Sequence, residues 1–169
     1  MKKLFPLFLT IILLFFGVGC SAHWYRLPEK FEVKNSRLNW VNIYYQAEES
    51  APRIRCEMSD SGQIMILEGH SVTVGDDFNI EYHKKDFRDI RKYYYSMDPE
   101  MFRVTLQMLV DNGLLVREKL DEDSPVYPKV MIKANINHVT VDKFTVNETL
   151  IDEIRSLLFQ YKMSGTLTK

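Results

Sequence analysis

Apolar and polar residues alternate with a period of two in three segments of this 169-residue chain, at residues 40–45, 53–58 and 129–141. Successive side chains of a β-strand point to opposite faces of a sheet, so this alternation predicts strands with one buried face. A chain with several such strands must cover one face of a sheet, and this requirement constrains the fold most. In residues 129–141 the apolar side consists of Val130, Ile132, Ala134 and Ile136.

A fourth strand is predicted at residues 63–69, QIMILEG, which are almost continuously apolar. The preceding residues 59–62, SDSG, supply turn chemistry, and Gly62 can adopt the positive φ of a tight turn. Residues 53–58 and 63–69 are therefore expected to form a hairpin. A short further strand is expected at residues 70–74.

Residues 79–95 fit both a helix and a strand. One face of a helix would collect His83, Phe87, Ile90 and Tyr94, whereas three consecutive tyrosines at 93–95 are typical of a strand. We expect a helix here. Five basic residues and two acidic ones lie between positions 83 and 92. On a helix the basic residues could form an interaction surface for anionic headgroups or an acidic partner, although a solvated face is the ordinary alternative. These residues are Lys84, Lys85, Arg88, Arg91 and Lys92.

Two helices have clear end signals. The first follows Asp98 as N-cap, has Pro99 in its first turn and stops at Gly113. Its expected buried stripe is Phe102, Leu106, Leu109 and Val110. The second is expected to begin at a capping box made by Thr145 and Glu148. Its 3.6-residue stripe, which indicates core packing, is Leu150, Ile151, Ile154, Leu157, Leu158 and Tyr161.

This order of elements predicts an α+β fold, with a single mostly antiparallel sheet and two or three helices packed on one face. We place a single domain at residues 39–163, preceded by a tether at residues 20–38 and followed by a tail at residues 164–169. Cys20 and Cys56 are the only cysteines. Cys56 is expected to be a small buried apolar residue.

The N-terminus has the organisation of an export signal, in which Lys2 and Lys3 precede an uncharged apolar run at residues 4–19. This run is shorter than the roughly 20 residues that span a bilayer, although an uncleaved anchor stays open as an alternative. The residues GVGC that end the run resemble the lipobox of bacterial lipoproteins. That resemblance implies cleavage next to Val18 and Gly19, followed by acylation of Cys20. It further implies a lipid-anchored protein facing the periplasm, with Ser21 favouring the outer over the inner membrane.

A second resemblance concerns residues 59–73 and 129–161. Their turn, strand and final amphipathic helix are similar to the periplasmic domain of the ExbD/TolR biopolymer-transport family. That family uses a true transmembrane helix. The resemblance implies, as an alternative, an energy-coupling or cell-wall-contacting component with an uncleaved N-terminal membrane helix.

No catalytic constellation is apparent from the sequence. The four histidines, His23, His70, His83 and His138, lack metal-ligand spacing, and no phosphate loop or nucleophile motif occurs. We therefore expect no catalytic residues, no metal and no cofactor. The net charge of −1 argues against nucleic acid as a partner. The sequence favours a non-catalytic envelope lipoprotein that binds membrane lipid through Cys20 and an envelope protein or the cell wall through its domain. An envelope hydrolase is the less favoured alternative.

Overall fold

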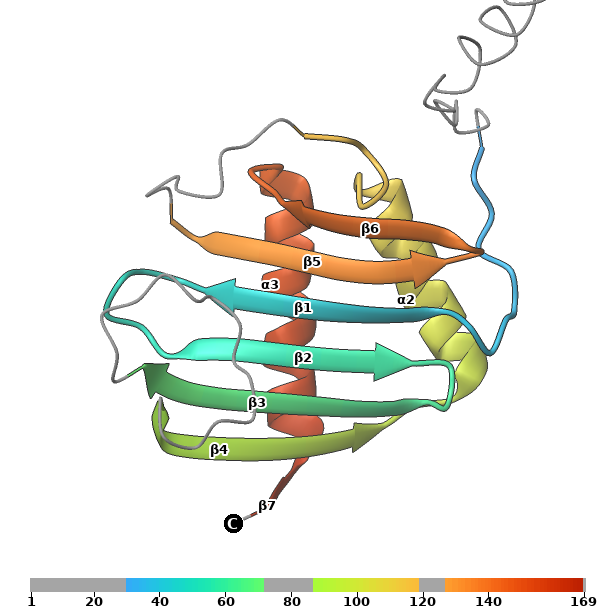
Figure 1. Ribbon diagram of the computed structural model, residues 1–169. Helices are drawn as coiled ribbons and strands as arrows, with labels where there is room; N and C mark the ends of the chain where they lie inside the picture. The colour runs from blue at the N-terminus through green and yellow to red at the C-terminus, as the bar shows by residue number, and fades with distance from the viewer. Residues whose placement is uncertain (1–29, 72–86, 119–126, 169) are drawn as a thin grey trace, which may run out of the picture. The chain divides into compact units, whose positions relative to one another are not determined.

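The computed structural model describes residues 30–71, 87–118 and 127–168 (Figure 1). The described residues from Glu32 onward form one compact unit, to which Lys30 and Phe31 do not belong. Within the described residues this unit contains one seven-stranded sheet, and every neighbouring pair of strands is antiparallel. Two helices cover one face of this sheet (Figure 1). The predicted α+β class, with one antiparallel sheet and helices on one face, is confirmed.

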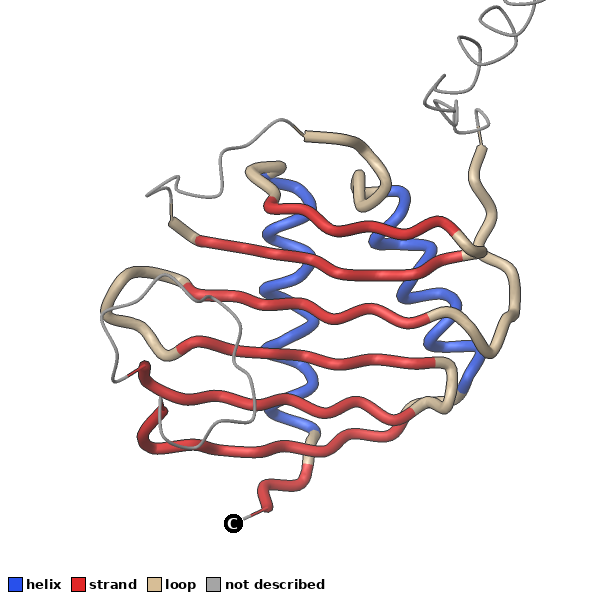
Figure 2. The backbone as a smooth tube through the Cα atoms, viewed as in Figure 1, coloured by secondary structure: helices blue, strands red, loops and turns tan. Residues whose placement is uncertain are grey.

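The sheet has the strand order β6-β5-β1-β2-β3-β4-β7. Figure 2 shows both helices, drawn in blue, on the same side of these strands. The strands are β1 (Trp40–Gln46), β2 (Arg53–Ser59), β3 (Gln63–Ser71), β4 (Phe87–Ser96), β5 (Lys129–Ile136), β6 (Val139–Phe144) and β7 (Thr166–Thr168). The helices are α2 (Pro99–Asp111) and α3 (Glu148–Ser164).

The core lies between the sheet and the helices. The buried residues of the period-two strands form the part of the core on the sheet side. Ile43 on β1 is aligned with Cys56 on β2 and Ile132 on β5, and each of the three is at most 1% exposed. Cys56 is thus a buried apolar residue, as expected. Burial raises the pKa of its thiol far above the ordinary value, which keeps the sulfur protonated and unreactive.

The apolar stripes of α2 and α3 form the part of the core on the helix side. All six residues of the predicted stripe on α3 are buried. On α2 the buried residues are Phe102, Thr105, Leu106 and Leu109, whereas Val110 is half-buried. Asp98 is the N-cap of α2, as predicted, and its side chain accepts a hydrogen bond from the Glu100 amide at 2.8 Å.

The predicted capping box on the last helix is wrong. The N-cap is Asn147, whose side chain accepts a hydrogen bond from the Leu150 amide at 3.3 Å. The Thr145 hydroxyl instead donates to Glu118 at 2.6 Å and accepts from the Asn147 amide at 3.2 Å. Both bonds of a capping box are therefore replaced, because the hydroxyl accepts from Asn147 and not from the Glu148 amide, and the Thr145 amide donates to the Val130 carbonyl.

The helix predicted at residues 79–95 is also wrong for its described part, because Phe87–Ser96 form β4. Residues 79–86 lie outside the described residues. Pairing with β3 aligns Tyr93 with Ile66 and Tyr95 with Ile64, so these aromatic side chains extend the covered face of the sheet. The strand preference of the tyrosines and this pairing outweigh the helical spacing.

Residues 129–141, expected to be one strand, form the hairpin β5–β6. Asn137 and His138 form its two-residue turn with φ values of 50° and 68°. Such a turn with two positive φ values matches the twist of the flanking strands, and asparagine tolerates this conformation well. The apolar alternation changes phase at this turn, from Ile136 to Val139 and Val141, and this change is the sequence signal that separates the two strands.

The strand expected at residues 70–74 is described only as the end of β3, at His70 and Ser71. Within the segment assigned to a tail, Thr166–Thr168 form β7 beside β4. Residues 32–39, assigned to the tether, contact the domain. Val33 is 1% exposed, and its amide donates to the side chain of Gln107 on α2 at 2.7 Å.

Candidate functional site

The three residues that the sequence singled out for lipidation and cleavage lie outside the described part of the chain, namely Cys20 and its flanking Val18 and Gly19. Their roles stay predictions. Lys84 and Lys85 of the expected basic surface are also outside it. Arg88, Arg91 and Lys92 lie on β4, and the first two are exposed.

The strand geometry separates the described basic residues. Arg91 and Lys92 are consecutive on β4, so their side chains point to opposite faces of the sheet. Lys92 lies 5.0 Å from the ring centroid of Tyr94. The interaction surface predicted on a helix face therefore has a different arrangement, although its role as a binding surface stays a prediction.

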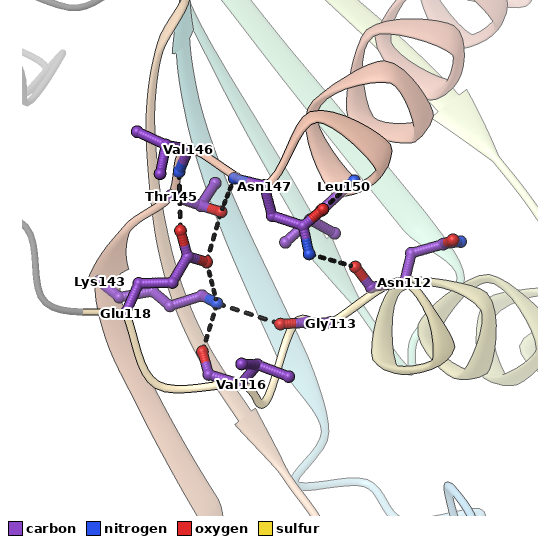
Figure 3. A network of polar contacts seen from close by, with 9 residues as sticks. All are labelled: Asn112, Gly113, Val116, Glu118, Lys143, Thr145, Val146, Asn147 and Leu150. Atoms are coloured by element: carbon purple, nitrogen blue, oxygen red, sulfur yellow. Dashed lines mark hydrogen bonds and ion pairs between the residues drawn. The ribbon is translucent and has the colours of Figure 1, made fainter.

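A compact polar network joins the end of α2 to the start of α3 (Figure 3). Glu118 accepts hydrogen bonds from the Lys143 ammonium at 2.9 Å, the Thr145 hydroxyl at 2.6 Å and the Val146 amide at 2.8 Å. Lys143 also donates to the carbonyl oxygens of Gly113 and Val116. The side chains of Glu118 and Lys143 are only 14% and 10% exposed.

Two opposing effects act on the pKa of Glu118. Burial raises it, but the hydrogen bonds from Thr145, Lys143 and Val146, together with the charge of Lys143, outweigh burial and hold the pKa below its ordinary value. The Glu118 carboxylate, the Lys143 ammonium and the Thr145 hydroxyl all bond to protein groups inside the fold, which is typical of a structural link. A surface that can meet a ligand or partner lies elsewhere on the domain.

A groove between α2 and α3 is such a surface. It has a volume of about 370 Å³, and its walls come from both helices and the end of β4. Met101 and Val104 on its rim are 57% and 47% exposed. The stacked rings of Tyr95 and Tyr161, 5.2 Å apart, also line it. Burial raises the pKa of Tyr161 to about 12, so its hydroxyl stays neutral at physiological pH.

The charged residues of this groove are acidic. Its lining contains the carboxylates Asp98 and Glu153 and no lysine, arginine or histidine from the described residues. Asp98 is engaged as the cap of α2. Glu153 is half-buried on α3 and forms no ion pair with any described residue. The groove thus combines flexible apolar side chains with negative charge on its α3 wall.

Three residues of the groove on α2 were not singled out from the sequence, although the sequence contains a signal for them. Met101, Val104 and Met108 are spaced by three and four residues and form a second apolar stripe on α2, beside the stripe that enters the core. An amphipathic helix needs one such stripe to bury one face. A second stripe indicates that another surface of the helix meets something apolar.

Neither family models nor curated proteins nor solved structures gave a match to this chain. Among the described residues, neither helix is long and apolar enough to span a bilayer. The same residues contain no group of three potential metal ligands.

Proposed function

We propose that this protein is a bacterial envelope lipoprotein, anchored through Cys20, whose folded domain serves as an interaction module of a larger envelope assembly. The groove between α2 and α3 carries the interaction part of this proposal. Exposed methionine side chains adapt to varied apolar partners because they are long, flexible and polarisable. The groove belongs to the helical layer, so it stays accessible while the sheet and the buried stripes hold the domain together.

The charge of the groove specifies the partner further. A protein segment that inserts apolar side chains between the helices would meet Glu153 on the α3 wall. A lysine or arginine beside the inserted residues would pair with this carboxylate and offset its desolvation. The partner that fits is therefore a protein segment with an apolar face flanked by basic residues, as in the common binding of an amphipathic helix to a groove.

In-cell photo-cross-linking tests the groove directly. A photoreactive side chain at position 101 is expected to cross-link an envelope protein through an apolar segment that contains lysine or arginine. The matched control is position 163, because Met163 is also exposed on a helix, at 71%, but does not line the groove. Glu153→Lys should abolish the cross-link from position 101. Equal cross-linking from both positions, or no effect of Glu153→Lys, would contradict the proposal.

Fatty-acid labelling tests the anchor. Labelled palmitate should be incorporated into the wild-type protein and not into Cys20→Ala, with Cys56→Ala as the matched control because Cys56 is buried. The mass of the mature N-terminus gives a second measurement. An acylated Cys20 at the N-terminus supports the lipoprotein, whereas an intact Met1 would contradict it and favour the uncleaved anchor.

A further inference from the structure

The face of the sheet that neither helix covers carries a hollow of about 480 Å³ near the β2–β3 turn. This face points toward the viewer in Figure 1. Trp40 on β1 and Tyr94 on β4 both line the hollow and are 37% and 43% exposed. Strands β2 and β3 lie between them, so a strand spacing of roughly 4.8 Å sets their backbones about 14 Å apart across the sheet.

The floor between the two aromatic residues is mixed, because Glu57 and Met65 lie between Asn42 and Tyr94 in the strand register and polar side chains surround them. Asn42, Gln63 and Ser59 line the hollow. The Asn42 and Gln63 amides have no hydrogen-bond partner among the residues that the structure describes. Each amide offers two donor hydrogens and one acceptor oxygen to a ligand. An acyl chain in this hollow would leave those amides desolvated and unpaired, which argues against a lipid ligand.

The charges at the hollow are balanced. Its one carboxylate, Glu57, forms an ion pair with Arg55. Lys133, the cross-strand neighbour of Asn42, lies 3.9 Å from Asp142. No lysine or arginine from the described residues lines the hollow, which argues against a phosphate or nucleic-acid ligand. The Lys92 ammonium that contacts the Tyr94 ring is not part of the lining.

We propose that this hollow binds a neutral oligosaccharide, with Trp40 and Tyr94 as its stacking residues and Asn42 and Gln63 as its hydrogen-bonding residues. The electron-rich face of an aromatic ring attracts the C–H bonds on the face of a pyranose ring. Sugar hydroxyls both donate and accept hydrogen bonds, which matches the amides of the floor. The distance between the two aromatic residues exceeds one sugar ring, so a short chain fits better than a monosaccharide.

This inference goes beyond the protein partner proposed above, because it concerns the opposite face of the domain. Titration calorimetry of the full-length chain tests it, in a detergent without a sugar headgroup. The probes are cellotetraose, chitotetraose and maltotetraose, which differ in linkage and substituents. At least one of them should bind saturably, and Trp40→Ala should weaken that binding about three- to tenfold. Trp40→Phe, which keeps a stacking ring, should restore most of the affinity.

The matched control is Phe159→Ala, because Phe159 is exposed on α3, at 68%, away from this face. It should leave saccharide binding unchanged. Should Trp40→Ala fail to fold by circular dichroism, Tyr94→Ala and Asn42→Ala carry the test and are each expected to weaken binding. Three results would each overturn the proposal: no binding of any of the three probes, unaltered binding by the folded variants, or tighter binding of an anionic heparin hexasaccharide. None of these three results would change the cross-linking expected from position 101, so the two proposals can fail separately.

Discussion

Glu118 shows how one residue links parts of the chain that are far apart in sequence. It follows α2, yet its carboxylate accepts hydrogen bonds from Lys143 and Thr145 and from the backbone before α3. The local pattern around Thr145 suggested that its hydroxyl accepts from the Glu148 amide, and nothing in the sequence pointed to Glu118 as the acceptor to which this hydroxyl donates. A buried hydroxyl bonds to the acceptor that the tertiary fold brings to it, so its partner could not be predicted from spacing.

Replacing Glu118 with glutamine should lower the free energy of unfolding by about 2 kcal/mol, because the ion pair and the charge-assisted hydrogen bonds of a mostly buried network are lost. Urea unfolding at pH 7 measures this change. The matched control is Asp142→Asn, whose carboxylate is 66% exposed and 3.9 Å from Lys133, and should cost less than about 1 kcal/mol. Equal effects of the two variants would contradict the structural role of the network.

The depressed pKa of Glu118 also predicts a pH dependence. A carboxylate with a lower pKa in the folded state contributes its full stabilisation above its ordinary pKa of 4.5. The contribution decreases as the pH falls from there through the folded-state pKa. The difference in stability between wild type and Glu118→Gln should therefore be constant near neutral pH and shrink below pH 4.5. A difference that grows on acidification would show that the pKa is raised instead.

At the scale of elements, the helices and central strands were predicted well because their signals lie within a few residues. The Asp98 cap and the stripe of α3 are examples. The wrong predictions concern segments whose structure depends on the strand that pairs with them. β4 is a strand because β3 pairs with it, and β5 separates from β6 because Asn137 and His138 turn the chain. Met101 and Val104 were missed because only the placement of α3 turns their stripe into a groove wall.

The β2–β3 turn gives a test at this scale. Gly62 has a φ of 73°, and an added Cβ would overlap the carbonyl oxygen of Met97. Gly62→Ala should therefore lower the free energy of unfolding by more than about 1 kcal/mol. In the control Gly69→Ala, the nearest atom to the new Cβ would be Ile90 Cγ1 at 3.4 Å. That variant should stay within about 1 kcal/mol of wild type in the same urea titration. The prediction fails if both alanines are tolerated equally.

At the scale of the whole molecule, the chain before β1 is held against the β5–β6 turn. Asn137 accepts a hydrogen bond from the Lys34 amide at 2.9 Å and donates one to the Glu32 carbonyl at 2.7 Å. The backbone N–H of Asn137 donates a third hydrogen bond to the side-chain oxygen of Asn39 at 2.9 Å. This bond does not depend on the side chain at position 137. Residues 32–39 thus contact a turn roughly a hundred positions later in the sequence, which a tether alone would not do.

Asn137→Gly should loosen this segment around Glu32 and Lys34 without straining the turn, because glycine adopts a positive φ freely. Two hydrogen bonds worth about 1 kcal/mol each would be lost, so limited trypsin digestion after Lys34 should accelerate about tenfold or more. His138→Gly is the matched control, since His138 has the same positive φ and its exposed side chain makes no hydrogen bond with the described residues. Similar cleavage rates in all three proteins would contradict the contact.

The sequence alone predicts the class of this fold, the covered face of each central strand and the buried faces of the helices. It could do so because side-chain period and capping act between neighbours in the chain. The strand order of the sheet, the partners of Thr145 and the surfaces that stay open became visible only in the folded domain. All three features depend on contacts between segments that are distant in sequence, such as β5 with β1 and α2 with α3. Such contacts stabilise the fold only when both segments are in place.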